Sequence, residues 1–326
     1  MVKYSSEYPS SDGSLLQPLL NRIAECPALI APEREAELGE VQKVTPWKYD
    51  FDLADGARGI SANLDTNTIN LPLAQLERLW AMTYGFLEYF DIGRKHPPGV
   101  EIGVDQCPEM KIPSEMLNWA AAGMEKKVRF QWPEHLPQPG QPKGTDEELL
   151  EKVNRHFLGA VAFIILHEIG HLHYRHEAPK FQSEDESIRC EFEADAWAAA
   201  WIMEKCPEDL KLWIFRADVC VLALTMINLV EYQEGPQSGK RTHPPTVERI
   251  LRFSDRWARE SEGKVAHLKD FPLYLAASIL QTQRLNLGLD VAPGIQHGSM
   301  TDYLVDAMRV FRERKLPDDG NYACEI

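Results

Sequence analysis

The chain has 326 residues, of which 44% are hydrophobic and 26% are charged, the composition of an ordinary globular protein. Its 35 basic and 50 acidic side chains give a formal net charge of −15, which argues against binding to the phosphate backbone of nucleic acids. The six cysteines are scattered and form no C-x-x-C pair. The sequence therefore predicts neither a zinc ribbon nor a redox motif, and it fits a reducing compartment.

Two features bear on the location of the protein. The first 14 residues are polar and lack the apolar run of a signal peptide. The longest apolar stretches, Phe157–Leu166 and Val219–Val230, are shorter than the roughly 20 residues that span a bilayer. We therefore expect a cytoplasmic protein without a transmembrane segment.

In chain order, the N-terminal part combines helices with a short β section. Apolar periodicity predicts helices at Leu15–Cys26, Glu33–Val41 and Leu73–Phe90. Between the last two, Gly59–Leu64 and Thr68–Leu71 flank an Asp-Thr-Asn sequence that is typical of turns. These two segments are predicted to be strands.

A stretch rich in proline and glycine, from Pro133 to Gly144, separates this part from a helical second half. We place an N-terminal subdomain at residues 1–132, a linker at 133–145 and a helical portion at 146–326. The fold class that follows is α+β, mainly α, with a small β-sheet. Helices in the second half are predicted at Leu149–His176, Ser187–Cys206, Asp209–Tyr232, Thr246–Glu260, Pro272–Asn286 and Thr301–Arg314.

The segment from His167 to His171, with the sequence HEIGH, lies in a strongly apolar predicted helix. Helical positions four apart share one face, so both imidazoles can reach the same metal ion. Glu168 is rotated away by one position, which places its carboxylate where it can take a proton from metal-bound water. The alternative is a core helix in which all three side chains are satisfied by hydrogen bonds, although buried charges without partners are rare.

A catalytic zinc site uses three protein ligands and one water, so the motif needs a third ligand. Glu191 and Asp195 are four residues apart on the next predicted helix and share a face. We expect Glu191 to bind zinc and Asp195 to accept a hydrogen bond from a ligand histidine. Glu193 is predicted to point elsewhere, as a solvated surface residue. The alternative interpretation of this stretch is an acidic helix start.

A loop at Thr242–Pro245, with the sequence Thr-His-Pro-Pro, enters the helix that carries Arg249. Proline is tolerated in the first turn of a helix, which favours a helix start here. His243 is a candidate donor to the oxyanion of a tetrahedral intermediate, and Arg249 is a candidate partner for a carboxylate of the site. Taken alone, the segment also fits a helix start with an exposed histidine.

The other histidines show no ligand spacing. A third histidine ligand of the metzincin type would need glycine at Tyr174 and histidine at Glu177, so this scheme fails. We expect His176 to cap the end of its helix, where a positive charge is favoured. His156 is interpreted as an ordinary residue.

Together these motifs resemble known peptidase families. H-E-x-x-H followed by E-x-x-x-D, with a step of 20 residues from His171 to Glu191, is similar to the gluzincin metallopeptidases. The Thr-His-Pro sequence and the later Arg-Ile resemble the M48-type peptidases. The phage-exclusion Lit-type peptidase family, U49, is similar over much of the chain. The segments that carry this likeness are Ala31–Glu35, Leu76–Trp80, the HEIGH helix up to His176, Glu191–Asp195 and Thr242–Ile250.

The resemblance implies a gluzincin-like zinc peptidase core with Zn²⁺ as the cofactor. It also implies an intracellular protease of anti-phage defence that cuts a protein or peptide substrate, which in that family is a translation factor. Two alternatives stay open: a zinc-holding regulator or toxin–antitoxin partner without turnover, and a helical interaction protein without metal. The intact Glu168 argues against the first alternative, and a metal assay decides the second.

Overall fold

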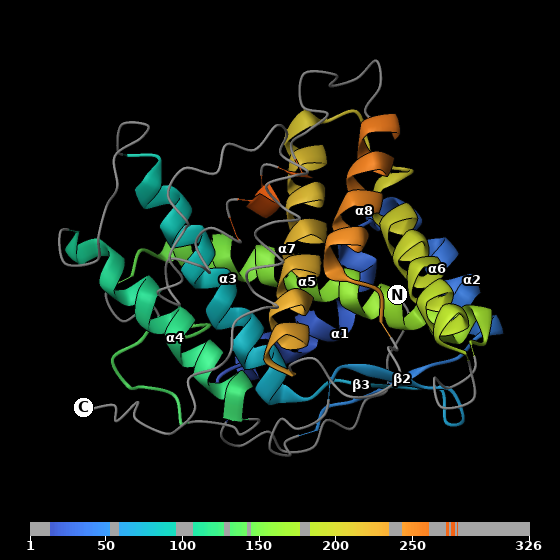
Figure 1. The fold of residues 1–326 in the computed structure, drawn as a ribbon, viewed down its shortest axis with the longest axis horizontal. Helices are drawn as coiled ribbons and strands as arrows, with labels where there is room; N and C mark the ends of the chain where they lie inside the picture. The colour runs from blue at the N-terminus through green and yellow to red at the C-terminus, as the bar shows by residue number, and fades with distance from the viewer. Residues whose placement is uncertain are drawn as a thin grey trace.

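The computed structural model describes most of the first 260 residues. They form a mostly helical fold with one small β-sheet, which confirms the predicted α+β, mainly α class (Figure 1). The helix predicted at Thr301–Arg314 lies outside the described residues. Of the helix predicted at Pro272–Asn286, only some of the first residues are described. The described ranges are 14–52, 59–95, 107–126, 131–141, 145–176, 183–234 and 243–260, with six further residues between 272 and 279.

The N-terminal part places three short strands between helices, in the order η1 (Gln17–Leu19), α1 (Leu20–Leu29), η2 (Pro32–Arg34), α2 (Glu35–Val44), β1 (Lys48–Asp50), β2 (Ser61–Asn63), β3 (Thr68–Asn70) and α3 (Leu73–Gly93). The strand order in the sheet is β1-β3-β2, with β1 parallel and β2 antiparallel to β3. The side chain of Asn63 accepts hydrogen bonds from the backbone of the turn between β2 and β3. The two predicted strands are therefore confirmed, whereas β1 was not predicted.

The remaining elements are helical: η4 (Pro108–Met110), α4 (Lys111–Lys126), α5 (Glu147–Tyr174), α6 (Glu184–Met203), α7 (Leu210–Glu234) and α8 (Thr246–Glu260). Local capping explains two of their starts. The Asp146 side chain accepts a hydrogen bond from the first turn of α5, and Ser183 forms a capping box with Glu186 at the start of α6. The sequence predicted α5, α6, α7 and α8, with ends within a few residues, but neither η4 nor α4.

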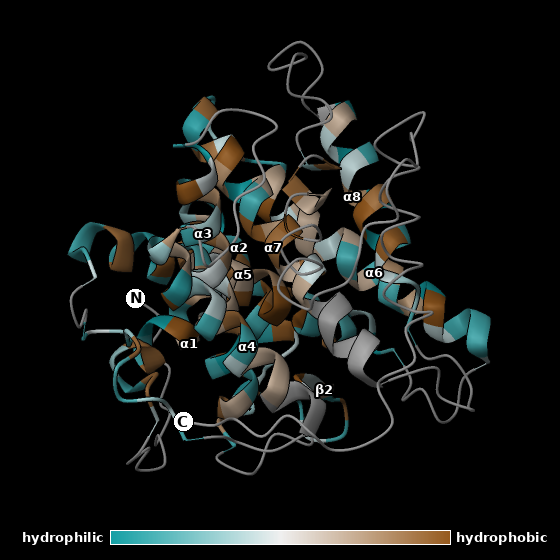
Figure 2. Cartoon of the chain, turned by 60° about the vertical axis from the view of Figure 1, so that its left-hand side comes forward, coloured by the Kyte–Doolittle hydropathy of each residue, from teal (hydrophilic) through white to brown (hydrophobic). Residues whose placement is uncertain are grey.

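Helix α5 runs through the middle of the molecule (Figure 1). It contacts α1, α3, α6 and α7, and it also contacts β2 and β3 of the sheet. Figure 2 shows hydrophobic residues gathered where α5 and α7 cross the centre. One continuous cluster of buried hydrophobic side chains extends from Leu16 to Ile279 and so joins residues from both sides of the predicted linker.

Among the described residues, α5 alone is long and apolar enough to cross a membrane by length and composition. The same test is passed by core helices, and 83% of the apolar window of α5 is buried inside this structure. Its apolar surface is thus covered by the neighbouring helices.

Candidate metal centre

A close approach between α5 and α6 brings the predicted ligands together. Gly170 faces Ala194, and a Cβ atom added at Gly170 would lie 3.2 Å from the Cα of Ala194. The missing side chain lets the two helix backbones come near each other. Because Glu191 and Asp195 lie on either side of Ala194 along α6, this contact carries both carboxylates to the histidine face of α5.

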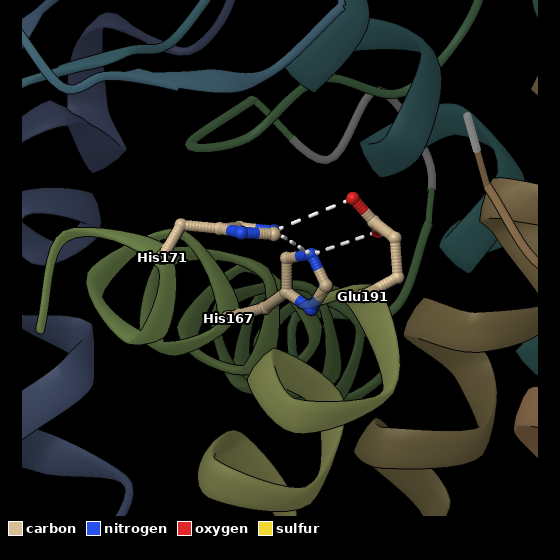
Figure 3. Close-up of side chains that lie close together, drawn as sticks. All are labelled: His167, His171 and Glu191. Carbon is tan, nitrogen blue, oxygen red and sulfur yellow. Dashed lines mark hydrogen bonds and ion pairs between the residues drawn. The ribbon is translucent and has the colours of Figure 1, made fainter. Parts of the chain in front are cut away.

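The side chains of His167, His171 and Glu191 point toward one another (Figure 3). The Nε2 atoms of the two histidines are 3.0 Å apart, and they lie 3.4 Å and 3.5 Å from the two carboxylate oxygens of Glu191. Nitrogen and oxygen ligands about 2.0–2.2 Å from a tetrahedral zinc ion lie roughly 3.3–3.5 Å from each other. The two nitrogen–oxygen distances match this spacing, and the nitrogen–nitrogen distance of 3.0 Å is somewhat shorter. The three groups could hold a metal ion, and imidazole with carboxylate is a ligand set that suits zinc.

A second pair of side chains holds His167 in place. The Nδ1 atom of His167 is 2.9 Å from Oδ1 of Asp195. The guanidinium of Arg249 donates one hydrogen bond to each oxygen of the same carboxylate, at 2.6 Å to Oδ1 and 2.7 Å to Oδ2. All three side chains are largely buried. With Nδ1–H donating to Asp195, the Nε2 lone pair of His167 is directed at the other two donors.

The pKa values of the three donors follow from burial and from their mutual contacts. Burial opposes protonation of His167, but hydrogen bonds to Asp195 and Glu191 outweigh it and raise the pKa of His167 to about 10. Burial and the charge of His167 lower the pKa of His171 to about 3. Burial acts to raise the pKa of Glu191, yet its hydrogen bond and charge interaction with His167 bring it below the usual range. Without a metal ion, His167 is therefore protonated at neutral pH, and a metal ion would take the place of the proton on its Nε2 atom.

Glu168 lies beside this donor group and is itself buried. Burial raises the pKa of its carboxyl group to about 7, against opposing contributions that include the charge of His167 and a hydrogen bond from the backbone of Ala62. Ala62 is the central residue of β2. The sheet therefore holds this carboxylate, a contact for which the sequence offers no side-chain signal.

His243 lies at the exposed rim of the group. Its side chain is 53% exposed, and its Nε2 atom is 3.6 Å from Oε1 of Glu191. The structure thus brings all seven of the predicted site residues together: His167, Glu168, His171, Glu191, Asp195, His243 and Arg249.

Of two predictions about neighbouring residues, one was incomplete and one was wrong. The side chain of Glu193 is 40% exposed, as expected for a surface residue, but its Oε2 atom also lies 3.1 Å from Nε2 of His176. His176 does not act as a charged cap: its side chain is buried, and its Nδ1 atom is 2.9 Å from Nδ1 of His171. Burial lowers the pKa of His176, which favours the neutral ring. The five-residue step from His171 to His176 was the only signal for this contact in the sequence.

Comparison with known proteins agrees with this geometry. The model of the family described as Peptidase U49 matches residues 69–268, which include every residue of the group and more than half of the chain. The chain belongs to this family. It is also 27% identical over 249 residues to the cell death peptidase of Escherichia coli (strain K12), an alignment that covers 71% of this chain and 78% of that protein. No solved structure matches the chain.

Membership of a peptidase family makes the chain a protease, and a protease acts on a protein substrate. The buried group of His167, His171 and Glu191 can hold a metal ion.

Proposed function

We propose that the chain is a zinc-dependent endopeptidase that hydrolyses peptide bonds of a cytoplasmic protein. The observation that carries this proposal is the convergence of two imidazoles and one carboxylate within hydrogen-bond range of each other, on two buried helices of a peptidase. His167, His171 and Glu191 would hold the zinc ion. When bound, zinc lowers the pKa of a coordinated water toward about 7 and polarises a carbonyl group.

Side chains of the protein transfer the proton of the attacking water and stabilise the oxyanion. Glu168 lies next to the ligand His167 and takes the proton from the attacking water, then passes it to the leaving amine. His243 at the exposed rim donates a hydrogen bond to the oxyanion that forms on the substrate carbonyl. Asp195 and Arg249 orient the ring of His167.

The sheet offers a place for the substrate backbone. β2 is the outer strand of the sheet order β1-β3-β2 and lies against α5. An extended peptide that pairs with β2 would run past Ala62, whose backbone already bonds to Glu168. This arrangement would bring a scissile peptide bond to the general base.

The biological role that we propose is phage exclusion by cleavage of a cytoplasmic protein such as a translation factor. Support comes from the U49 family and from a relative whose name is cell death peptidase. The alternative, a zinc-binding regulator without turnover, differs from this proposal in one measurable property, the appearance of new protein termini.

The test compares cells that express the wild-type chain with cells that express Glu168→Gln, by mass spectrometry of newly formed N-termini. Because general base catalysis contributes about 10²–10⁴-fold, Glu168→Gln should lower the yield of the specific termini by at least about 100-fold. A matched control is Glu151→Gln, the same change at an exposed position of α5. Equal cleavage by Glu168→Gln and wild type would remove Glu168 from its role, and cleavage by none of the three would favour the regulator.

A further inference from the structure

The ligand His171 has a buried hydrogen-bond partner that the proposed mechanism does not use. Its Nδ1 atom, on the side of the ring opposite the donor group, is 2.9 Å from Nδ1 of His176. The Nε2 atom of His176 is in turn 3.1 Å from Oε2 of Glu193, and Oε1 of Glu193 is 2.8 Å from the guanidinium of Arg189. A continuous row of contacts thus leads from the donor group to the surface of α6.

The chemistry of imidazole fixes the protons along this row. A contact between two Nδ1 atoms needs one donor and one acceptor. A metal ion at Nε2 of His171 requires the lone pair of that atom, so the proton of His171 is on Nδ1 and donates to His176. His176 then accepts at Nδ1 and carries its own proton on Nε2, where the Glu193 carboxylate accepts it.

The backbone at the end of α5 is shaped to make this contact. Arg175 has a φ of 53°, in the left-handed region that residues other than glycine rarely adopt. This turn folds the chain back, so that the backbone N–H of His176 bonds to the carbonyl of His171 and its side chain returns to the ring of His171. Strained conformations of this kind persist where the surrounding contacts fix them and are concentrated at functional sites.

We infer that His176 is a positioning residue of the metal centre, which holds the ring of His171 with its Nε2 atom directed at the metal. This inference rests on the proposed function, because it needs a metal at that atom. Each ligand histidine then has a hydrogen-bond acceptor that a further side chain holds in place. His167 donates to Asp195, which Arg249 binds. His171 donates to His176, which Glu193 binds.

Three substitutions at His176 separate positioning from packing, with zinc affinity measured by competition with a chelator. His176→Asn places an amide oxygen where Nδ1 was and keeps the acceptor for His171. His176→Gln places an amide nitrogen where Nε2 was and keeps only the donor to Glu193, and His176→Ala keeps neither. Loss of a hydrogen-bond partner of a metal ligand lowers metal affinity by about 10–100-fold. We therefore expect His176→Gln and His176→Ala to bind zinc about 10–100-fold more weakly than wild type, and His176→Asn to stay within a few-fold of it. Packing alone predicts the opposite order for Asn and Gln, since glutamine is closer to histidine in volume.

The control is His173→Asn, the same change on an exposed residue of α5 whose ring stacks on Trp197. It should bind zinc like wild type. Equal affinity of all His176 variants, a loss in His176→Asn as large as in His176→Ala, or a loss in the control would overturn the inference.

A second measurement needs no variant. Nitrogen NMR of the wild-type zinc protein should find the proton of His171 on Nδ1 and that of His176 on Nε2. A proton on Nδ1 of His176 would overturn the inference even if the variants failed to fold. A wild-type chain that binds no zinc would remove both the inference and the proposed function, whereas wild-type binding with unchanged variants removes the inference alone.

Discussion

At two places a histidine of helix α5 lies beside a carboxylate of a neighbouring helix. The two pairs differ in whether the histidine and the carboxylate are hydrogen-bonded. Near the C-terminal end of α5, His167 is 2.9 Å from Asp195 on α6, and Arg249 binds the same carboxylate. Eleven residues earlier in the same helix, His156 faces Asp218 on α7 with 4.0 Å between Nε2 and Oδ2, which is beyond hydrogen-bond range. No ion pair with arginine holds Asp218 among the described residues.

The consequences appear in the pKa values. Burial lowers the pKa of His156 to about 4 and raises the pKa of Asp218 to about 7, so both side chains favour their neutral forms. At the metal centre, hydrogen bonds and charges overcome burial, and the pKa of Asp195 is lowered. A buried histidine beside a carboxylate is therefore not enough for a metal site. A third ligand must lie within reach, and each imidazole ring must be oriented by a hydrogen bond to its other nitrogen. In the described part of the chain, this happens at His167, His171 and Glu191.

The sharpest test of this difference is to remove each aspartate in turn. Asp195→Ala leaves the buried guanidinium of Arg249 without its carboxylate, and breaking a buried ion pair in this way costs about 3–5 kcal/mol in the free energy of unfolding. Urea denaturation with a chelator present measures this loss without a contribution from zinc binding. A loss below about 1 kcal/mol would show that the pair is not an essential part of the structure.

Removal of the charge of Asp218 should have the opposite sign and depend on pH. A carboxyl group whose pKa rises from 3.8 to about 7 on folding contributes stability below pH 3.8 and loses it as the pH rises through 7. The asparagine variant does not titrate, so Asp218→Asn should gain about 2–4 kcal/mol relative to wild type between pH 4 and pH 8.

The measurement is the difference in unfolding free energy between the two proteins across that pH range. The difference isolates Asp218 from the other titrating groups near it, which are His156, Lys152, Arg155 and Asp91. A difference that does not change with pH would mean that folding does not raise the pKa of Asp218.

Much of the inner site could be predicted because it depends on local spacing. His167 and His171 share a helix face by periodicity, and so do Glu191 and Asp195. Long amphipathic or apolar helices such as α3, α5 and α6 were predicted for the same reason. The division at residues 133–145 stays a prediction.

The residues that were missed depend on long-range or backbone geometry. The contact of His176 requires the left-handed turn at Arg175, and nothing about an arginine favours that conformation. The contact of Ala62 with Glu168 comes from the backbone of a strand more than 100 residues away. The contact of Glu193 with His176 depends on the same turn, so it was missed as well.

The most direct test of the central claim is the zinc content of the purified chain after dialysis, measured by elemental analysis. We expect one zinc per chain in the wild type and in Glu168→Gln, and close to none in His171→Ala or Glu191→Ala, because these two remove a donor from a set of three. A wild-type chain without stoichiometric zinc, or a full equivalent of zinc retained by both ligand variants, would contradict the account.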